Sequence, residues 1–455
     1  MRALFLLCLL IACSAHSPRA HAEEPTSLSL APHFRSPQPG TPIELPDGTY
    51  NTKAFRTLTG LRGTPDQPIH IRAAHRGKVI ITGDAGLILR DCEHVILEGL
   101  IFENDADQQC VQLDNCRHVR ITRNVFRPKE RAKPRHWEHW VTVDGARSAD
   151  NRIDHNLFER KVNRGSPLFI RGDDAALVCS QRDRVDHNHF RDVIYANREN
   201  GHETIRTGGN DLGAAGKSSF TIIEHNLLER CSGEDEIISI KSSDNVIRNN
   251  TLIDCRGAVC MRLGNRNEVS GNVIIATQDG PGFGGIKLFG FEHRVTGNYF
   301  QGLTGTKHEA PFALTPGMMD APSTENIRDK YDDMTAAAPT RCHIADNTWI
   351  DCSPLQFGYE KGKEDKKWPL SPNGCVFVNN RVLRIQAQVK AMPLIILGTV
   401  RDLQARENVL YDAGATYSGN WHENWGTWVT ELPEVKVPKR LTEADVGPAA
   451  RETQD

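Results

Sequence analysis

The chain of 455 residues carries 55 Lys and Arg against 58 Asp and Glu, which gives a net charge of −3, and 38% of its residues are hydrophobic. This composition is typical of a soluble globular protein. It argues against a general nucleic-acid binder, whose surface would need an excess of positive charge, so no nucleic-acid partner is expected.

The first 22 residues have the features of an export signal. Arg2 precedes an apolar run over residues 3–12, and Ala-His-Ala at 20–22 forms a small-x-small cleavage site. The run is too short to cross a bilayer, so we expect no membrane span. Residues 10–13 (LIAC) also resemble a bacterial lipobox ending at Cys13. The sequence therefore predicts a secreted or periplasmic protein, with an outer-membrane lipoprotein anchored at Cys13 as the alternative.

The segments after the signal repeat. Residues 91–102 (DCEHVILEGLIF) precede residues 115–126 (NCRHVRITRNVF) by 24 positions, with Cys, His, Val and Phe identical in register. Each unit consists of a β-branched strand, a turn centred on Asn, and a second short apolar strand. Similar units follow at residues 151–158, 183–190, 222–228, 246–252, 268–274, 294–300, 342–349 and 375–382.

This period of about 22–32 residues is typical of a repeat solenoid. A β-propeller needs longer blades, and a leucine-rich repeat needs a leucine lattice that the chain lacks. We therefore predict an all-β fold, a right-handed parallel β-helix. The repeated Asn side chains suit the turns, where Asn tolerates the left-handed conformation and can form a hydrogen-bonded ladder. These structural asparagines are Asn124, Asn156, Asn188, Asn250, Asn272 and Asn298.

The repeat sets the domain boundaries. A parallel β-helix domain is predicted over residues 23–415, with loop insertions at 127–139, 307–340 and 356–372, and a C-terminal cap and polar tail over 416–455. Ten of the twelve cysteines follow the signal and form no CxxC pair. Cys92 and Cys116 occupy matching repeat positions, which favours stacked buried thiols, although export would permit disulfides.

One strand-like stretch concentrates chemically active side chains. Glu234 and Glu236 are two positions apart, so on a strand both carboxylates point to one face. Such a pair suits Ca²⁺, which prefers hard oxygen ligands. A third oxygen ligand can come from the preceding coil, where Asn200 is the first choice and Glu203 the alternative.

Lys241 and Arg262 complete this group. They are 21 residues apart, about one coil, so Arg262 is expected to stack beside Lys241. A nearby cation favours the neutral amine of a lysine, which can then act as a base. Arginine can donate hydrogen bonds to a developing anion. This set suits β-elimination on a uronic-acid polysaccharide, in which the proton at C5 is removed and the C4 oxygen departs.

At these residues the chain resembles polysaccharide lyase family 6, the parallel β-helix family of alginate lyases and chondroitinase B. The resemblance implies Lys241 as the base, Arg262 as the acid, and Ca²⁺ held by Asn200, Glu234 and Glu236. Ile240 departs from the family, which usually has Asn before the lysine, and the segment 209–219 differs in length. The matching segments are residues 151–161, 200–208, 231–243, 261–267, 284–305, 347–352 and 441–448.

The expected substrate is an anionic uronate polysaccharide. Alginate is favoured and dermatan sulfate is the alternative, since no dense arginine cluster for sulfate is evident. The candidate substrate-binding residues are Arg206, His202, Lys161 and His293. Two other classes remain open: a pectin-type hydrolase using paired acids such as Asp173 and Asp174, and a non-catalytic polysaccharide-binding β-helix. The sequence leaves monomer and dimer equally open.

Overall fold

The computed structural model describes residues 28–34, 37–53, 56–84, 86–105, 109–130, 137–195, 198, 200–210, 216–318, 336–358, 368–386, 393–413 and 425–449. The predicted signal peptide, with Cys13, and residues 416–424 of the predicted cap lie outside these ranges. No helix within them is long and apolar enough to cross a membrane.

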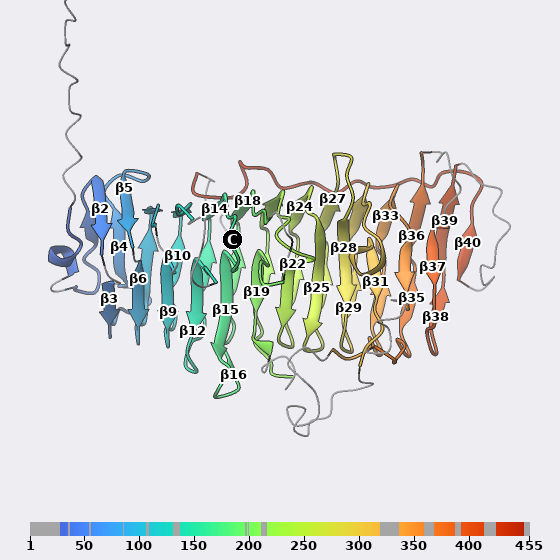
Figure 1. Ribbon diagram of the computed structural model, residues 1–455, viewed down its shortest axis with the longest axis horizontal. Helices are drawn as coiled ribbons and strands as arrows, with labels where there is room; N and C mark the ends of the chain where they lie inside the picture. Colours follow the sequence, from blue (N-terminus) through green and yellow to red (C-terminus); the bar gives the residue numbers. More distant parts are fainter. Residues whose placement is uncertain are drawn as a thin grey trace, which may run out of the picture.

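The chain winds into a right-handed parallel β-helix in which each coil adds one short strand to each of three sheets (Figure 1). The predicted fold class is thereby confirmed. In the described ranges, sheet 1 has 13 strands. They are β1 (Ile43–Leu45), β4 (Ile69–Ala73), β7 (Val95–Glu98), β10 (Arg120–Thr122), β13 (Arg152–Asp154), β17 (Arg184–Asp186), β20 (Ile222–Glu224), β23 (Val246–Arg248), β26 (Glu268–Ser270), β29 (Arg294–Thr296), β32 (His343–Ala345), β35 (Val376–Val378) and β38 (Gln404–Arg406).

Sheet 2 has 14 strands in the same part of the chain. They are β2 (Gly48–Thr52), β5 (Val79–Gly83), β8 (Ile101–Phe102), β11 (Val125–Phe126), β14 (Leu157–Glu159), β18 (His189–Arg191), β21 (Leu227–Glu229), β24 (Thr251–Ile253), β27 (Val273–Ile275), β30 (Tyr299–Gln301), β33 (Thr348–Ile350), β36 (Arg381–Arg384), β39 (Asn408–Asp412) and β40 (Gly426–Trp428).

Sheet 3 carries the site discussed below and has 13 described strands. They are β3 (Arg56–Thr59), β6 (Leu87–Arg90), β9 (Val111–Asp114), β12 (Val141–Asp144), β15 (Leu168–Asp173), β16 (Val178–Cys179), β19 (Ile205–Thr207), β22 (Glu236–Lys241), β25 (Gly257–Leu263), β28 (Phe283–Leu288), β31 (Phe312–Leu314), β34 (Leu355–Phe357) and β37 (Ile395–Leu397). β16 pairs antiparallel with β15 as a hairpin. Two 3₁₀ helices, η1 (Ala31–Phe34) and η2 (Lys307–Glu309), complete the described elements.

The core forms because identical repeat positions stack along the solenoid axis. Parallel pairing places equivalent residues of successive coils side by side, so every inward position meets another apolar side chain. Phe102, Phe126, Phe158 and Phe190 show this most clearly, with ring centroids 4.9, 4.7 and 4.6 Å apart in successive pairs. Apolar burial is therefore continuous from one end of the molecule to the other.

The repeated asparagines form the predicted ladder. The Asn188 side-chain oxygen accepts hydrogen bonds from the backbone N–H and the side-chain amide of Asn156, both at 3.0 Å. The left-handed conformation, however, falls on the residue before each Asn, such as His155 with φ of 52°. The ladder frees the Asn side chain for hydrogen bonding and leaves the strained angle to its neighbour. Its members are Asn124, Asn156, Asn188, Asn226, Asn250, Asn272, Asn298, Asn347, Asn380 and Asn408.

Replacing Asn188 by alanine should destabilise the fold by about 2–4 kcal/mol, since buried donors and acceptors on three coils lose their partners. The Asn188 amide donates to Ile153 and Asp186 carbonyls and to Asn226. Chemical denaturation of the variant and the wild type measures the difference. An unchanged unfolding midpoint would contradict the ladder's contribution to stability.

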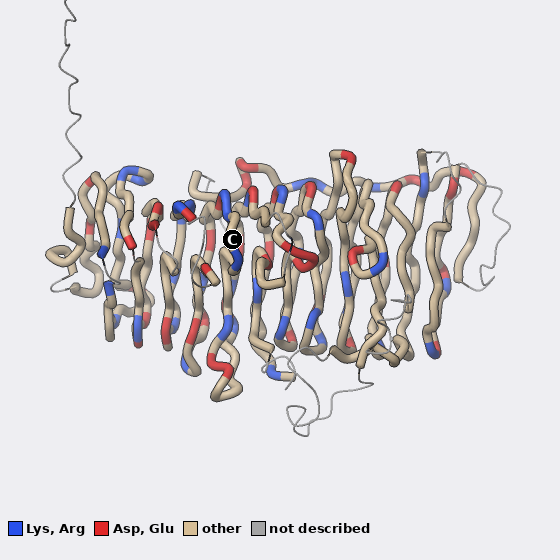
Figure 2. The backbone as a smooth tube through the Cα atoms, in the orientation of Figure 1, with Lys and Arg blue, Asp and Glu red and all other residues tan. Residues whose placement is uncertain are grey.

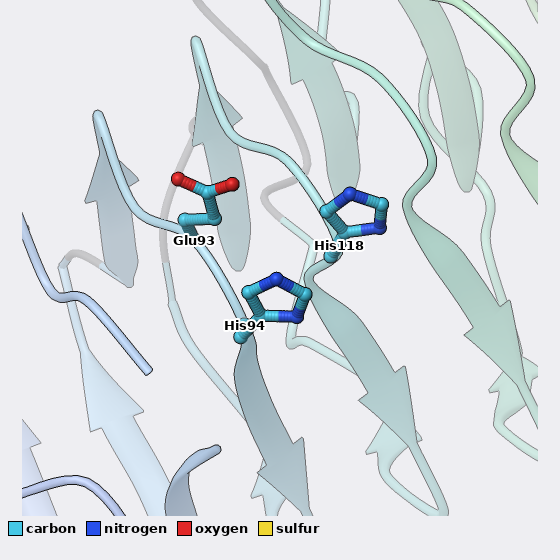
Figure 3. Close-up of side chains that lie close together, drawn as sticks. All are labelled: Glu93, His94 and His118. Carbon is cyan, nitrogen blue, oxygen red and sulfur yellow. The ribbon is translucent and has the colours of Figure 1, made fainter. Parts of the chain in front are cut away.

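Other side chains stack in the same way. Cys92 and Cys116 are buried free thiols. All ten described cysteines are free, and all but the half-buried Cys352 are buried. The prediction of thiols over disulfides is therefore confirmed for that part of the chain. His94 and His118 lie parallel, with centroids 4.6 Å apart and planes inclined by 3°, next to Glu93 (Figure 3). One nitrogen of each ring and one carboxylate oxygen of Glu93 lie within 4.8 Å of one another.

The end of the described chain turns back along the solenoid. After β40, residues 432–448, here called the strap, run over the outer face of sheet 2 toward the N-terminal coils (Figure 1). Arg381 donates to a backbone carbonyl near the start of the strap at 2.7 Å. Arg76 and Arg123 both donate to the carbonyl of Pro448 near its end, at 2.9 and 3.0 Å. The strap thus links coils that are far apart in the sequence.

Candidate active site

The site lies on the outer face of sheet 3, where strand alternation separates core from surface. On β22, Ile238 and Ile240 point into the core, so Ser239 and Lys241 point outward. The same alternation on β25 turns Arg262 outward. Register pairs β22 with β19 on one side and β25 on the other, so polar side chains from consecutive coils gather on one surface.

Three carboxylates form the centre of the site. Glu203 precedes β19, Glu234 precedes β22, and Glu236 begins it. One carboxylate oxygen of each lies within 4.8 Å of those of the other two. Glu203 and Glu234 are 1% and 3% exposed, so the cluster is withdrawn from solvent. The two glutamates predicted as ligands therefore meet, and the third carboxylate is Glu203, the alternative ligand.

Asn200 stands one step outside this cluster. It is exposed, and its backbone carbonyl accepts a hydrogen bond from Arg164 Nε at 3.1 Å. The next residue, Gly201, donates its backbone N–H to the Glu234 carboxylate. Asn200 therefore belongs to the loop that supports Glu234, and its assignment as a metal ligand stays a prediction.

Lys241 and Arg262 approach the carboxylates from neighbouring strands. Lys241 Nζ lies 3.3 Å from Glu203 Oε1, and Arg262 Nε lies 3.6 Å from Glu236 Oε1. Since these two carboxylates belong to one cluster, the amine and the guanidinium face the same small volume. Both side chains are buried, at 6% and 8% exposure. Arg262 thus lies one coil after Lys241, at a β-bulge: the register pairs Ile240 with Met261 but Lys241 with Leu263.

Two further residues of the site escaped the sequence analysis. Lys287 Nζ lies 3.4 Å from Glu236 Oε1, and the Ser239 hydroxyl donates to Glu236 Oε2 at 2.6 Å. Lys287 follows from the register, which pairs Ser239 with Cys260 and Cys260 with the lysine. The signal was present in the sequence, because Lys287 stands alone between two apolar residues of a strand.

The charges of the cluster are unevenly balanced. Burial disfavours the Glu236 carboxylate, but Lys287, Arg262 and Lys241 outweigh it and lower the pKa of Glu236 to about 2. Glu234 has no ion pair among the described residues. Burial, together with the charges of the other two glutamates, raises the pKa of Glu234 to about 9, against the opposing effect of two backbone N–H donors. In the absence of a bound cation, Glu234 is therefore a neutral acid near pH 7.

Two of the four predicted substrate-binding residues lie at the cluster. Arg206 packs its guanidinium 4.5 Å from the centre of the Phe169 ring and 3.7 Å from Glu203 Oε1. His202 donates its backbone N–H to Glu234 at 3.0 Å, and its ring stacks on Tyr195. Burial lowers the pKa of His202 to about 3, so its imidazole is neutral.

The other two have internal roles in this structure. Lys161 is 0% exposed and pairs with Glu130 at 2.6 Å. His293 is also fully buried, with Nε2 bonded to the Phe289 carbonyl at 2.7 Å and Nδ1 accepting from Asn267 N–H at 3.1 Å. Neither side chain has exposed surface with which to contact a polymer. They support the framework on which the site is built.

The paired acids considered for a hydrolase lie at a hairpin. Asp173 ends β15, and its carboxylate accepts the backbone N–H of Ala176 at 3.0 Å in the turn to β16. That contact is turn chemistry, in which an aspartate side chain stabilises a tight reversal of the chain. It gives this carboxylate a structural task apart from the three-glutamate cluster.

The parallel β-helix of this chain matches a known protein family. Residues 28–376 match the family model described as Chondroitinase B. The chain belongs to this family, within polysaccharide lyase family 6. The resemblance inferred from the sequence motifs is thereby confirmed. No curated protein sequence matches the chain.

Solved structures of family 6 lyases are similar to this chain over most of its length. The alginate lyase AlyGC is 25% identical with a TM-score of 0.74, over 92% of this chain and 55% of AlyGC, so this chain spans about half of that protein. A mannuronic-acid-specific family 6 lyase from the human gut microbiota is 25% identical with a TM-score of 0.70, over 87% and 86% of the two chains. A family 6 alginate lyase in complex with a trisaccharide, 19% identical with a TM-score of 0.76 over 93% and 94%, shares the fold.

Proposed function

We propose that this protein is a secreted alginate lyase that cleaves its polymer by Ca²⁺-assisted β-elimination and releases 4,5-unsaturated oligosaccharides. One observation carries the proposal: the Lys241 amine and the Arg262 guanidinium approach one buried carboxylate cluster from neighbouring strands. A base and a hydrogen-bond donor held together in this way can act on adjacent carbons of one sugar ring.

In the proposed reaction, Lys241 removes the proton from C5 of the uronate. The electron pair of that bond forms the C4–C5 double bond, and the C4–O bond breaks. Arg262 donates a hydrogen bond to the departing C4 oxygen, which takes up a proton from solvent to become a hydroxyl, and Lys241 later returns the C5 proton to solvent. Phe289 supports Arg262, since its ring centre lies 5.4 Å from the guanidinium carbon. Arg206 would contact the sugar next to the cluster, while the buried His202 would act through its backbone N–H, which supports Glu234.

The carboxylates fit a bound Ca²⁺. Glu203, Glu234 and Glu236 provide hard oxygens close enough to share one ion, and Glu234 has no other cationic partner among the described residues. We take Glu203 as the third ligand in place of Asn200, because Glu203 lies in the cluster and Asn200 is exposed. When bound, Ca²⁺ would supply positive charge that stabilises the substrate carboxylate as negative charge develops.

Ca²⁺ binding should release about one proton at pH 7, because Glu234 must ionise to become a ligand and its pKa is about 9 without the ion. The Ca²⁺ affinity should accordingly rise as the pH increases toward 9. Without Ca²⁺, folding raises the pKa of Glu234 from 4.5 to about 9. The free energy of unfolding should therefore fall as the pH rises from 4.5 to about 9, because only the unfolded state loses this proton in that range. Calorimetric titration in buffers of different ionisation enthalpy counts the protons, and a count of zero would contradict this ligand assignment.

A panel of polymers tests the function. Wild-type protein is incubated with polymannuronate, polyguluronate, mixed alginate and dermatan sulfate, and the ultraviolet absorbance of the unsaturated product is followed. Absorbance with an alginate is the expected result. The family description favours dermatan sulfate as the second candidate, and absorbance with that polymer alone would replace alginate. Reducing ends without absorbance would indicate hydrolysis, and binding without either product would indicate a non-catalytic module.

A further inference from the structure

We infer that Trp137 forms a stacking surface for a uronate unit beside the catalytic cluster, an inference that deepens the proposed function and rests on it. Trp137 lies in the long connection between β11 and β12 and is 44% exposed, which is unusual for so large an apolar side chain. Carbohydrate rings present a flat array of C–H groups, and an indole offers a rigid apolar surface that matches it.

The adjacent residue explains why Trp137 points outward. Glu138 is 1% exposed, and the side-chain amide of Asn163 donates to both of its carboxylate oxygens, at 3.3 and 3.2 Å. The backbone N–H of Glu138 also bonds to the carbonyl of Arg164 at 2.7 Å. Glu138 is thus fixed inward, and its neighbour Trp137 lies at the surface. The exposure of Trp137 is therefore built into the loop.

Two contacts bring the indole to the site. A Cβ atom on Gly201 would lie 2.7 Å from Trp137 Cη2 and 2.8 Å from Cζ3, so the indole rests against a backbone that only glycine keeps clear. The φ angle of Gly201 is 97°, which independently favours glycine. The guanidinium of Arg164 lies 4.7 Å from the ring centre and holds the indole in place.

Gly201 connects this surface directly to the carboxylates. The same glycine that supports the indole donates its N–H to Glu234. A uronate held at the cluster therefore has its neighbour in the polymer within reach of Trp137. The guanidinium of Arg164 beside the ring adds positive charge, which favours an acidic sugar over a neutral one.

Trp137→Ala should raise the KM for alginate by about tenfold and change kcat by less than about twofold, since the contact acts on binding rather than on bond breaking. The KM of Trp137→Phe should lie between those of Trp137→Ala and the wild type, because a smaller ring keeps part of the contact. Trp428→Ala is the matched control: Trp428 is 36% exposed but lies on β40 at the far end of the solenoid. It should leave both constants unchanged.

Calorimetric binding of a uronate hexamer to Lys241→Ala protein, with and without Trp137→Ala, separates the two proposals. Tighter binding in the presence of Trp137 supports the stacking surface whether or not the wild type cleaves the polymer. Cleavage by the wild type with equal affinities and KM values for the Trp137 variants would overturn the stacking surface alone. Absence of both cleavage and hexamer binding would overturn the stacking surface together with the proposed function.

Discussion

Lys241→Ala should reduce kcat on alginate by about 10²–10⁴-fold, the usual effect of removing a general base. The fold should tolerate the change, because Glu203 keeps a second cation, Arg206, at 3.7 Å. Initial rates of unsaturated-product formation measure the loss, and circular dichroism of the same sample reports whether the sheets are intact.

Lys217→Ala is a suitable control for this variant. Lys217 is exposed, and within the described part of the chain no hydrogen bond or ion pair joins its side chain to the carboxylate cluster. Its replacement removes the same functional group and should leave the rate within about twofold of the wild type. Equal activity of the Lys241 variant and this control would remove Lys241 from the reaction.

Glu236→Gln should destabilise the protein by about 3–5 kcal/mol, the typical cost of breaking a buried ion pair. Glu236 is the acceptor shared by Lys287, Ser239 and Arg262. The amide that replaces it cannot neutralise the buried ammonium of Lys287, which is 4% exposed. Thermal and denaturant unfolding measure the effect, and Ca²⁺ affinity should fall in the same variant because one carboxylate ligand is lost.

A second substitution distinguishes charge balance from chemistry. Adding Lys287→Met to Glu236→Gln removes the uncompensated ammonium and should restore much of the lost stability. Activity should not return, since the carboxylate cluster is still incomplete. Restored activity in the stable double variant would show that Glu236 serves only to neutralise Lys287.

The fold could be predicted because its determinants are repeated. Strand alternation and the turn asparagines recur in coil after coil, so errors at one unit are corrected by the others. The exception was the left-handed backbone angle, which was placed on the asparagines and lies instead on the residue before each of them. A ladder that uses both the N–H and the side chain of Asn cannot be read from residue preference alone.

The site was predictable where it lies on regular strands. Glu236, Lys241 and Arg262 come together because β22 pairs with β25, although β-bulges shift the register at Glu236 and at Lys241, and Glu234 lies just before β22. Both signs of charge are interspersed along the solenoid (Figure 2), so net charge gives no guidance to their location. Site residues in irregular connections were harder to predict from the sequence. Asn200 and Glu203 are three positions apart on one loop, and only its path decides which of them faces the cluster.

The strap changes how a molecule of this shape can come apart. Stacked coils touch only their neighbours, so a plain array can fray from either end, one unit after another. Here the carbonyl of Pro448 is held by Arg76 and Arg123, which precede it by 372 and 325 residues. Unfolding of an early coil therefore also releases the strap. The N-terminal coils thus cannot unfold without loosening the strap that lies along the rest of the solenoid. These bonds can form only after nearly the whole polypeptide has left the ribosome, so full rigidity comes last in its assembly.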